Sequence, residues 1–154
     1  MTDRGRFEPG RAGTTAVFVD SSALYAQFHP RDECHRSVRR FIDGIREGSL
    51  PYRRLYTNDY VLDEVATRLR YRVGHDRAVT ALETVEASDL YHVALVSESV
   101  YEAGKTIFVE FGDQPLSLTD AVILAHADRL DVDHVLTYDG DFDAFDCTVL
   151  PHVR

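Results

Sequence analysis

The hydrophobic positions of the chain fall into short continuous runs and longer periodic stretches. The short runs are apolar or β-branched and end at polar or turn residues, which is typical of strands buried on both faces of a parallel sheet. The first run ends abruptly at Asp20. Strands are predicted over Thr15 to Val19, Tyr52 to Thr57, Leu90 to Val96, His134 to Thr137 and Cys147 to Leu150.

The longer stretches place apolar residues at the 3.6-residue spacing of amphipathic helices. Ser21 or Ser22, Asn58 or Asp59, and Ser97 stand where a helix cap is expected, and Pro30, Gly48 and Gly74 follow as stops. Helices are predicted from Ser21 or Ser22 to Phe28, over about 32–47, from Asn58 or Asp59 to Val73, over 76–86, from Ser97 to about Phe111, and over 117–130.

Strands that alternate with helices predict parallel pairing with right-handed crossovers. The fold class is therefore α/β, a three-layer α/β/α sandwich around a central, mostly parallel sheet. Residues 14–154 are interpreted as a single domain, because the chain of 154 residues has ordinary globular composition. Residues 1–13 contain glycine and proline without apolar periodicity, so we expect a flexible leader, with order beginning near Thr15.

Acidic residues mark one edge of the predicted sheet. Asp20 follows the first strand and Asp139 follows the fourth, and ligands of such sheets gather at the carboxyl ends of strands. Glu64 and Asp120 lie near helix starts that reach the same edge, and Asp141 comes close behind Asp139. Carboxylates without basic partners repel one another unless divalent cations neutralise them. Oxygen ligands favour Mg²⁺ or Mn²⁺, so the pattern predicts metal-assisted phosphodiester hydrolysis.

Each acidic residue also has a structural interpretation. Asp20 is placed to cap a helix, Glu64 to face solvent, Asp120 to complete a capping box with Ser117, and Asp139 to form a turn with Gly140. Asp63 competes with Glu64, because one residue along a helix rotates a side chain by about 100°.

Charge and cysteine content indicate the cellular compartment in which the protein works. The formal net charge is −9, and Lys105 is the only lysine, which suits either a high-salt cytoplasm or a GC-rich genome. Two distant cysteines favour neither a disulfide framework nor a zinc site, and no segment is typical of a signal peptide or membrane span. A reducing cytoplasm is the default prediction.

The middle of the chain differs in charge from the rest. Residues 31–77 contain eleven arginines against eight acidic residues, although the remainder is strongly acidic. Arg68, one helical turn after Glu64, is a candidate phosphate contact, and its alternative is a solvated or salt-bridged surface arginine. Tyr25 and Tyr60 are candidates for base stacking or for core packing.

Four segments together resemble the acidic blocks of PIN-domain ribonucleases, and in particular the VapC-type toxins of toxin–antitoxin pairs. The segments are residues 17–24, 57–65, 116–121 and 136–142, so the resemblance covers about Thr15 to Pro151. Carried over by position, the metal-binding and catalytic acids are Asp20, Glu64, Asp120 and Asp139. Thr137 and Ser21 match supporting polar residues, and Asp141 is a possible outer ligand.

The resemblance implies Mg²⁺ or Mn²⁺, endonucleolytic cleavage of RNA, a homodimer and a small antitoxin that covers the active site. Two alternatives stay open: a non-catalytic PIN-fold binding or assembly module, and a housekeeping RNA-processing nuclease. Other acidic α/β proteins fit less well. A phospho-receiver domain needs a lysine after its final strand, and an aspartate-nucleophile phosphatase needs an aspartate where this chain has Ser22.

Overall fold

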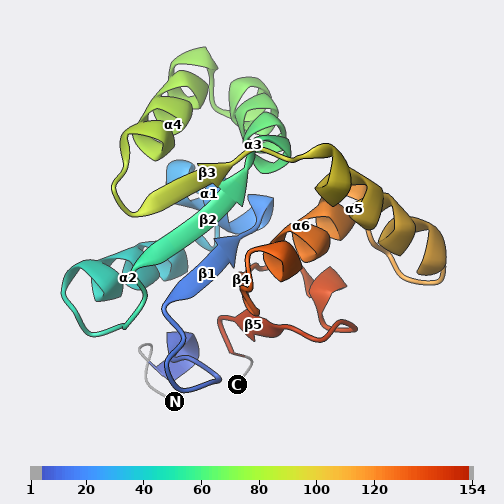
Figure 1. Ribbon diagram of the computed structural model, residues 1–154. Helices are drawn as coiled ribbons and strands as arrows, with labels where there is room; N and C mark the ends of the chain where they lie inside the picture. The colour runs from blue at the N-terminus through green and yellow to red at the C-terminus, as the bar shows by residue number, and fades with distance from the viewer. Residues whose placement is uncertain (1–4, 153–154) are drawn as a thin grey trace.

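The computed structural model describes residues 5–152, and its centre is a five-stranded sheet (Figure 1). Every neighbouring pair of strands is parallel, and the order across the sheet is β3-β2-β1-β4-β5. The prediction of a mostly parallel sheet is therefore confirmed. The strands are β1 (Ala16–Val19), β2 (Arg54–Asn58), β3 (Tyr91–Ala94), β4 (His134–Leu136) and β5 (Thr148–Leu150).

Helices flank the sheet as predicted for a three-layer α/β/α fold. The connections from β1 to β3 step across the sheet in one direction, and the connection from β3 to β4 returns past β1. Because crossovers are right-handed, this reversal puts the helices of the return on the other face of the sheet. The first group is α1 (Ser21–Phe28), α2 (His35–Arg46), α3 (Asp59–Arg72) and α4 (His75–Ala87), and the second is α5 (Glu98–Glu110) and α6 (Leu118–Arg129).

Polar side chains set several helix starts. Asn58 and Ser97 cap α3 and α5 by accepting hydrogen bonds from Val61 N and Val100 N, as predicted. The helix α1 differs, because its N-cap is Asp20 and Ser21 and Ser22 lie inside its first turn. No helix within residues 5–152 is both long enough and apolar enough to cross a membrane.

The apolar core lies against both faces of β1, whose residues Val17, Phe18 and Val19 are fully buried. A smaller cluster joins α5 to α6 through Val100, Val122 and Ala125. Gly104 allows these two helices to approach closely, since a Cβ atom there would lie 2.7 Å from Val122 Cγ2. This contact fixes α6, which carries Asp120 in its first turn.

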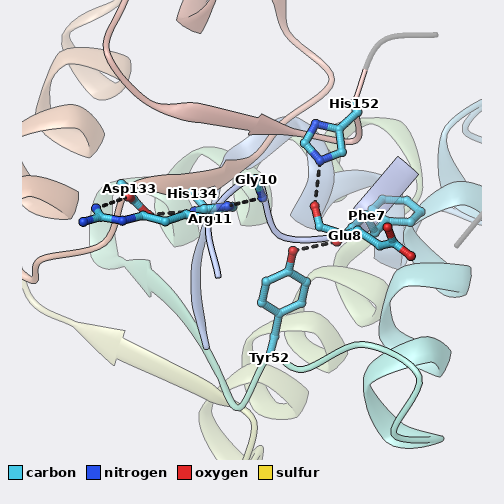
Figure 2. A network of polar contacts seen from close by, with 8 residues as sticks. All are labelled: Phe7, Glu8, Gly10, Arg11, Tyr52, Asp133, His134 and His152. Atoms are coloured by element: carbon cyan, nitrogen blue, oxygen red, sulfur yellow. Dashed lines mark hydrogen bonds and ion pairs between the residues drawn. The ribbon is translucent and has the colours of Figure 1, made fainter. Parts of the chain in front are cut away.

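Residues 5–13 pack against the domain, contrary to the expectation that order begins near Thr15 (Figure 2). Phe7 is 3% exposed and packs on Phe41, and the Tyr52 hydroxyl donates a hydrogen bond to Phe7 O at 2.6 Å. Gly10 N donates to His134 Nε2 at 3.0 Å. The packing of one isolated aromatic residue leaves no periodic pattern in the sequence. Residues 1–4 of the predicted leader lie outside the described part.

Candidate active site

The reversal of strand order between β1 and β4 creates the position at which open α/β sheets bind ligands. Asp20 directly follows β1, and Thr137 and Asp139 follow β4. Asp120 comes from the first turn of α6, and Glu64 from α3. Four chain segments therefore bring polar side chains to this edge, as the sequence predicted.

Asp20 is 1% exposed and is held by hydroxyl groups. Thr137 Oγ1 donates to Asp20 Oδ2 at 2.8 Å, and Ser22 Oγ donates to the same oxygen at 3.2 Å. Burial raises the pKa of Asp20, and the Thr137 hydrogen bond opposes that rise. Asp20 occupies the N-cap position of α1, but its side chain makes no capping hydrogen bond, so capping does not account for its carboxylate.

Ser21 connects Asp20 to Glu64. Its Oγ lies 3.2 Å from Glu64 Oε1 and 3.4 Å from Asp20 Oδ1, and its single hydroxyl hydrogen serves one of them at a time. Asp63 is exposed and has no such contact with Ser21. Of the two neighbouring acids on α3, Glu64 is therefore the one joined to Asp20.

Three carboxylates form a compact group beside Asp20. Asp120, Asp139 and Asp141 offer oxygen atoms that all lie within 4.8 Å of one another. Asp141 reaches the group because residues Gly140–Phe142 form a short 3-10 helix, whose first turn is capped by Asp139 Oδ1 accepting from Asp141 N at 3.3 Å. The sequence analysis proposed Asp20, Asp120 and Asp139 as metal ligands and gave Asp141 only as a possible outer ligand. In the structure, Asp141 completes the trio and Asp20 lies beside it.

The trio is electrostatically unfavourable as it stands. Burial, followed by the charge of Asp20, raises the pKa of Asp120 to about 6. Burial and the neighbouring Asp139 carboxyl raise the pKa of Asp141 to about 6 as well. Within residues 5–152, no lysine or arginine forms an ion pair with any of the three. A set of oxygen donors with unbalanced negative charge fits a hard divalent cation such as Mg²⁺ or Mn²⁺.

Asp120 also completes the capping box that the sequence predicted. Its Oδ2 accepts from Ser117 N at 3.1 Å, and Ser117 Oγ accepts from Asp120 N at 3.0 Å. The structural and functional interpretations of Asp120 are therefore compatible. The capping box fixes the orientation of the carboxylate, and the N-terminus of α6 favours its charged form.

Hydroxyl groups of Thr137 and Ser22 hold the acids in position through hydrogen bonds. Thr137 Oγ1 donates to Asp20 and accepts from Asp139 N at 3.0 Å, so it couples the ends of β1 and β4. Ser22 Oγ lies 3.2 Å from Thr137 Oγ1 and accepts from Tyr138 N at 3.0 Å. Sequence reasoning identified Ser21 and Thr137 but gave Ser22 only a helix-capping role. A serine in a first helical turn carries no signal that separates these roles.

A pocket of about 570 Å³ adjoins the acids along α3. Glu64 and Arg68 both line it, which agrees with their predicted placement on one side of the helix. Tyr60 also lines the pocket, whereas Tyr25 is buried beneath the Arg68 guanidinium. The pocket is lined by Asp59, Tyr60, Asp63, Glu64, Thr67, Arg68 and Thr119.

Known structures share this architecture. VapC20 of Mycobacterium tuberculosis, described as a Sarcin-Ricin loop cleaving toxin, is 26% identical with a TM-score of 0.75, over 83% of this chain and 93% of that one. A toxin–antitoxin complex from Klebsiella pneumoniae is 19% identical with a TM-score of 0.64, over 88% and 98%. FitAcB from Neisseria gonorrhoeae is 18% identical with a TM-score of 0.60, over 88% and 97%.

A comparison of the sequence with protein-family profiles identifies the family. No match was found among curated proteins. The profile of the PIN domain, however, matches residues 17–146, which include β4, β1 apart from its first residue, and all of the acids described above. Since the match spans most of the sequence and the fold agrees with it, this chain belongs to the PIN-domain family.

Proposed function

We propose that the protein is a metal-dependent endoribonuclease that hydrolyses phosphodiester bonds of RNA. The observation that carries this proposal is the acidic trio, which has no lysine or arginine partner among residues 5–152 and lies beside Asp20 at the ligand-binding edge of a PIN fold. RNA as the substrate is supported by the likeness to a structure described as a Sarcin-Ricin loop cleaving toxin. Carboxylates that hold divalent metal ions are one established way to hydrolyse phosphodiester bonds, and this edge provides such carboxylates.

The acids have distinct roles in this proposal. Mg²⁺ or Mn²⁺ would be held by Asp20, Asp120, Asp139 and Asp141. Glu64, which its contact with Ser21 keeps in place, would orient the attacking water or the ion. When bound, the ion makes water a stronger nucleophile and stabilises the oxygen that leaves. Thr137, Ser21 and Ser22 keep Asp20 in position, because each contributes a hydroxyl to its carboxylate.

The cellular role we propose is that of the toxin in a VapBC-type pair. The toxin–antitoxin complex from Klebsiella pneumoniae and VapBC2 from Rickettsia felis, whose structure contains a promoter DNA fragment, share this fold with the chain. A small antitoxin, a homodimer and action in the cytoplasm follow from this assignment. A gene for a small protein beside this one would support it.

Cleavage of total RNA by the purified protein tests the activity. We expect discrete fragments with Mn²⁺ and none with EDTA, and none from Asp20→Asn, because that variant removes a ligand charge while keeping the shape of the side chain. Asp43→Asn is the matched control, since it makes the same change at an exposed position of α2 that belongs neither to the acids nor to the pocket, and it should cleave normally.

The outcome of this cleavage assay distinguishes the catalytic assignment from a non-catalytic binding module. Full activity of a correctly folded Asp20→Asn protein contradicts the assignment of the site. Absence of cleavage by folded, partner-free wild-type protein across a range of salt favours a non-catalytic binding module instead.

A further inference from the structure

The guanidinium of Arg68 lies on an aromatic ring at the edge of the pocket. Arg68 Cζ is 4.2 Å from the centroid of Tyr25, which is 2% exposed. The Tyr25 hydroxyl is hydrogen-bonded to His29 Nδ1 at 2.8 Å, and the two rings meet edge to face at 5.2 Å. A buried ring anchored at its hydroxyl gives the guanidinium a fixed platform.

Arg68 forms no ion pair with any of the described acids, although several line the same pocket. Asp59, Asp63 and Glu64 line the same pocket, yet within residues 5–152 no carboxylate forms an ion pair with Arg68. Glu64, one turn earlier on α3, is engaged by Ser21 instead. The Tyr25 ring lies against the guanidinium carbon, and within residues 5–152 no hydrogen bond or ion pair engages the guanidinium N–H groups, which match the oxygens of a phosphate.

The charge of the site explains why such a group is needed. A nucleic-acid backbone that approaches Asp20, Asp120, Asp139 and Asp141 meets strong repulsion, which metal ions offset only near the trio. Arg68 supplies fixed positive charge in the neighbouring pocket, and a pocket of about 570 Å³ is within the usual range for small-ligand sites.

We propose that Arg68 binds a backbone phosphate of RNA in this pocket, next to the cleavage site, and that Tyr25 and His29 are positioning residues that hold its guanidinium in place. This inference rests on the proposed ribonuclease function. It assigns the pocket along α3 to the substrate strand, and it identifies the element that counteracts the negative charge of the acidic edge.

Fluorescence anisotropy with a labelled pool of 12-nucleotide single-stranded RNAs of mixed sequence tests the inference. The parent protein is Asp20→Asn in Mg²⁺, so that the RNA is not cut, and binding is measured over a series of KCl concentrations. Adding Arg68→Gln should weaken binding about tenfold. It should also make the slope of log affinity against log salt shallower by about 0.7, as expected when one phosphate contact is lost.

The same helix offers a matched control. Arg70→Gln makes the identical change in charge, but Arg70 is exposed and contacts His75, 2.7 Å from its Nη1, rather than the pocket. Affinity and slope should both stay at the parent values. Equal effects of Arg68→Gln and Arg70→Gln overturn the inference, and so does absence of RNA binding by the parent protein at the lowest salt.

Two conservative variants test the platform. Arg68→Lys keeps the charge, so the salt slope should be preserved, but affinity should fall between the parent and Arg68→Gln because the planar fork is gone. Tyr25→Phe keeps the ring and removes its bond to His29, and it should weaken binding about threefold with an unchanged slope. Parent affinity in folded Tyr25→Phe overturns the positioning role.

The cleavage assay with total RNA distinguishes this inference from the proposed function. Cleavage by wild-type protein, together with RNA binding that is indifferent to Arg68, overturns only the inference. Binding that depends on Arg68 in a protein that cuts no RNA overturns only the proposed activity.

Discussion

The two ends of strand β4 hold aspartates in opposite surroundings. At its start, Asp133 Oδ1 accepts from His134 Nδ1 at 2.7 Å, and Asp133 Oδ2 pairs with Arg11 Nη1 at 3.2 Å (Figure 2). The His134 hydrogen bond is the main reason that the pKa of Asp133 lies below its ordinary value. This carboxylate is stabilised as an anion and joins Arg11 to the sheet, while the neighbouring His134 Nε2 accepts from Gly10 N.

Beyond the other end of β4, Asp139 lies among like charges. Burial and neighbouring carboxylates raise the pKa values of Asp120 and Asp141 to about 6. Asp133, which serves the fold, is surrounded by donors, whereas no lysine or arginine of residues 5–152 pairs with the trio, as expected of carboxylates that bind a cation. The surroundings, rather than the residue type, separate the structural end of β4 from the candidate active site.

Replacing Asp120 should produce the largest effect at the acidic end. Asp120→Asn keeps an oxygen for the capping box but removes a ligand charge, so RNA cleavage should fall about a hundredfold or more, in the range of groups that stabilise the transition state. The thermal midpoint in EDTA should not fall, because like-charge repulsion is relieved. Asp120→Ala should lose the same activity and also about 1 kcal/mol of stability, since Ser117 N loses its acceptor in the capping box.

Substitution of His134 should lower the stability of the protein and leave RNA cleavage unchanged. His134→Leu leaves Gly10 N without an acceptor and Asp133 without its main donor, which should cost about 1 to 3 kcal/mol in denaturant unfolding. Cleavage per folded molecule should match wild type. Unchanged stability would show that the contacts of residues 5–13 with β4 do not support the fold.

Metal binding at the acidic end of β4 should raise the thermal stability of the protein. A ligand at a hundredfold excess over its Kd stabilises the folded state by about 2.7 kcal/mol, so Mg²⁺ should raise the thermal midpoint of the wild-type protein. Asp139→Asn should remove this response, and Asp146→Asn, at an exposed acid outside the trio, should retain it. An equal response in both variants argues against a site at the trio.

The pH dependence of the metal-free protein should also differ between the two ends of β4. The pKa of Asp120 is raised from 3.8 to about 6, so the folded state binds its proton more tightly, and this contribution to stability is gained as pH falls from about 6 to about 4. Asp133 acts oppositely, because a lowered pKa gives stability that is lost below about 3.8.

Paired thermal melts in EDTA isolate the contribution of Asp120. The midpoint of Asp120→Asn should exceed that of wild type at pH 7, and the difference should shrink by pH 4, where the wild-type carboxyl is protonated. A difference that is constant over this range contradicts the raised pKa.

Local patterns determined most of the fold. The buried run Val17 to Val19 identified β1 and therefore the position of Asp20 at a sheet edge, and alternation with helices identified the parallel sheet. Asn58 and Ser97 were recognisable as caps because their role depends on neighbouring backbone alone.

Features that depend on tertiary packing were less predictable. Sequence spacing left Asp63 and Glu64 as alternatives, and the contact with Ser21, 43 positions away, distinguishes them. Asp141 joins the trio because of a 3-10 turn that no periodic pattern signals. Phe7 is buried through long-range contacts with Phe41 and Tyr52, so the ordered packing of residues 5–13 was missed.

The close packing of α5 on α6 has a practical consequence for protein engineering. The turn between these helices, at residues 111–113, is exposed and lies between the segments that carry the acids. A break there would leave Asp20 and Glu64 on one fragment and Asp120, Asp139 and Asp141 on the other. If the proposed activity holds, RNA cleavage would then report the reassembly of two inactive fragments, as in a split-enzyme sensor.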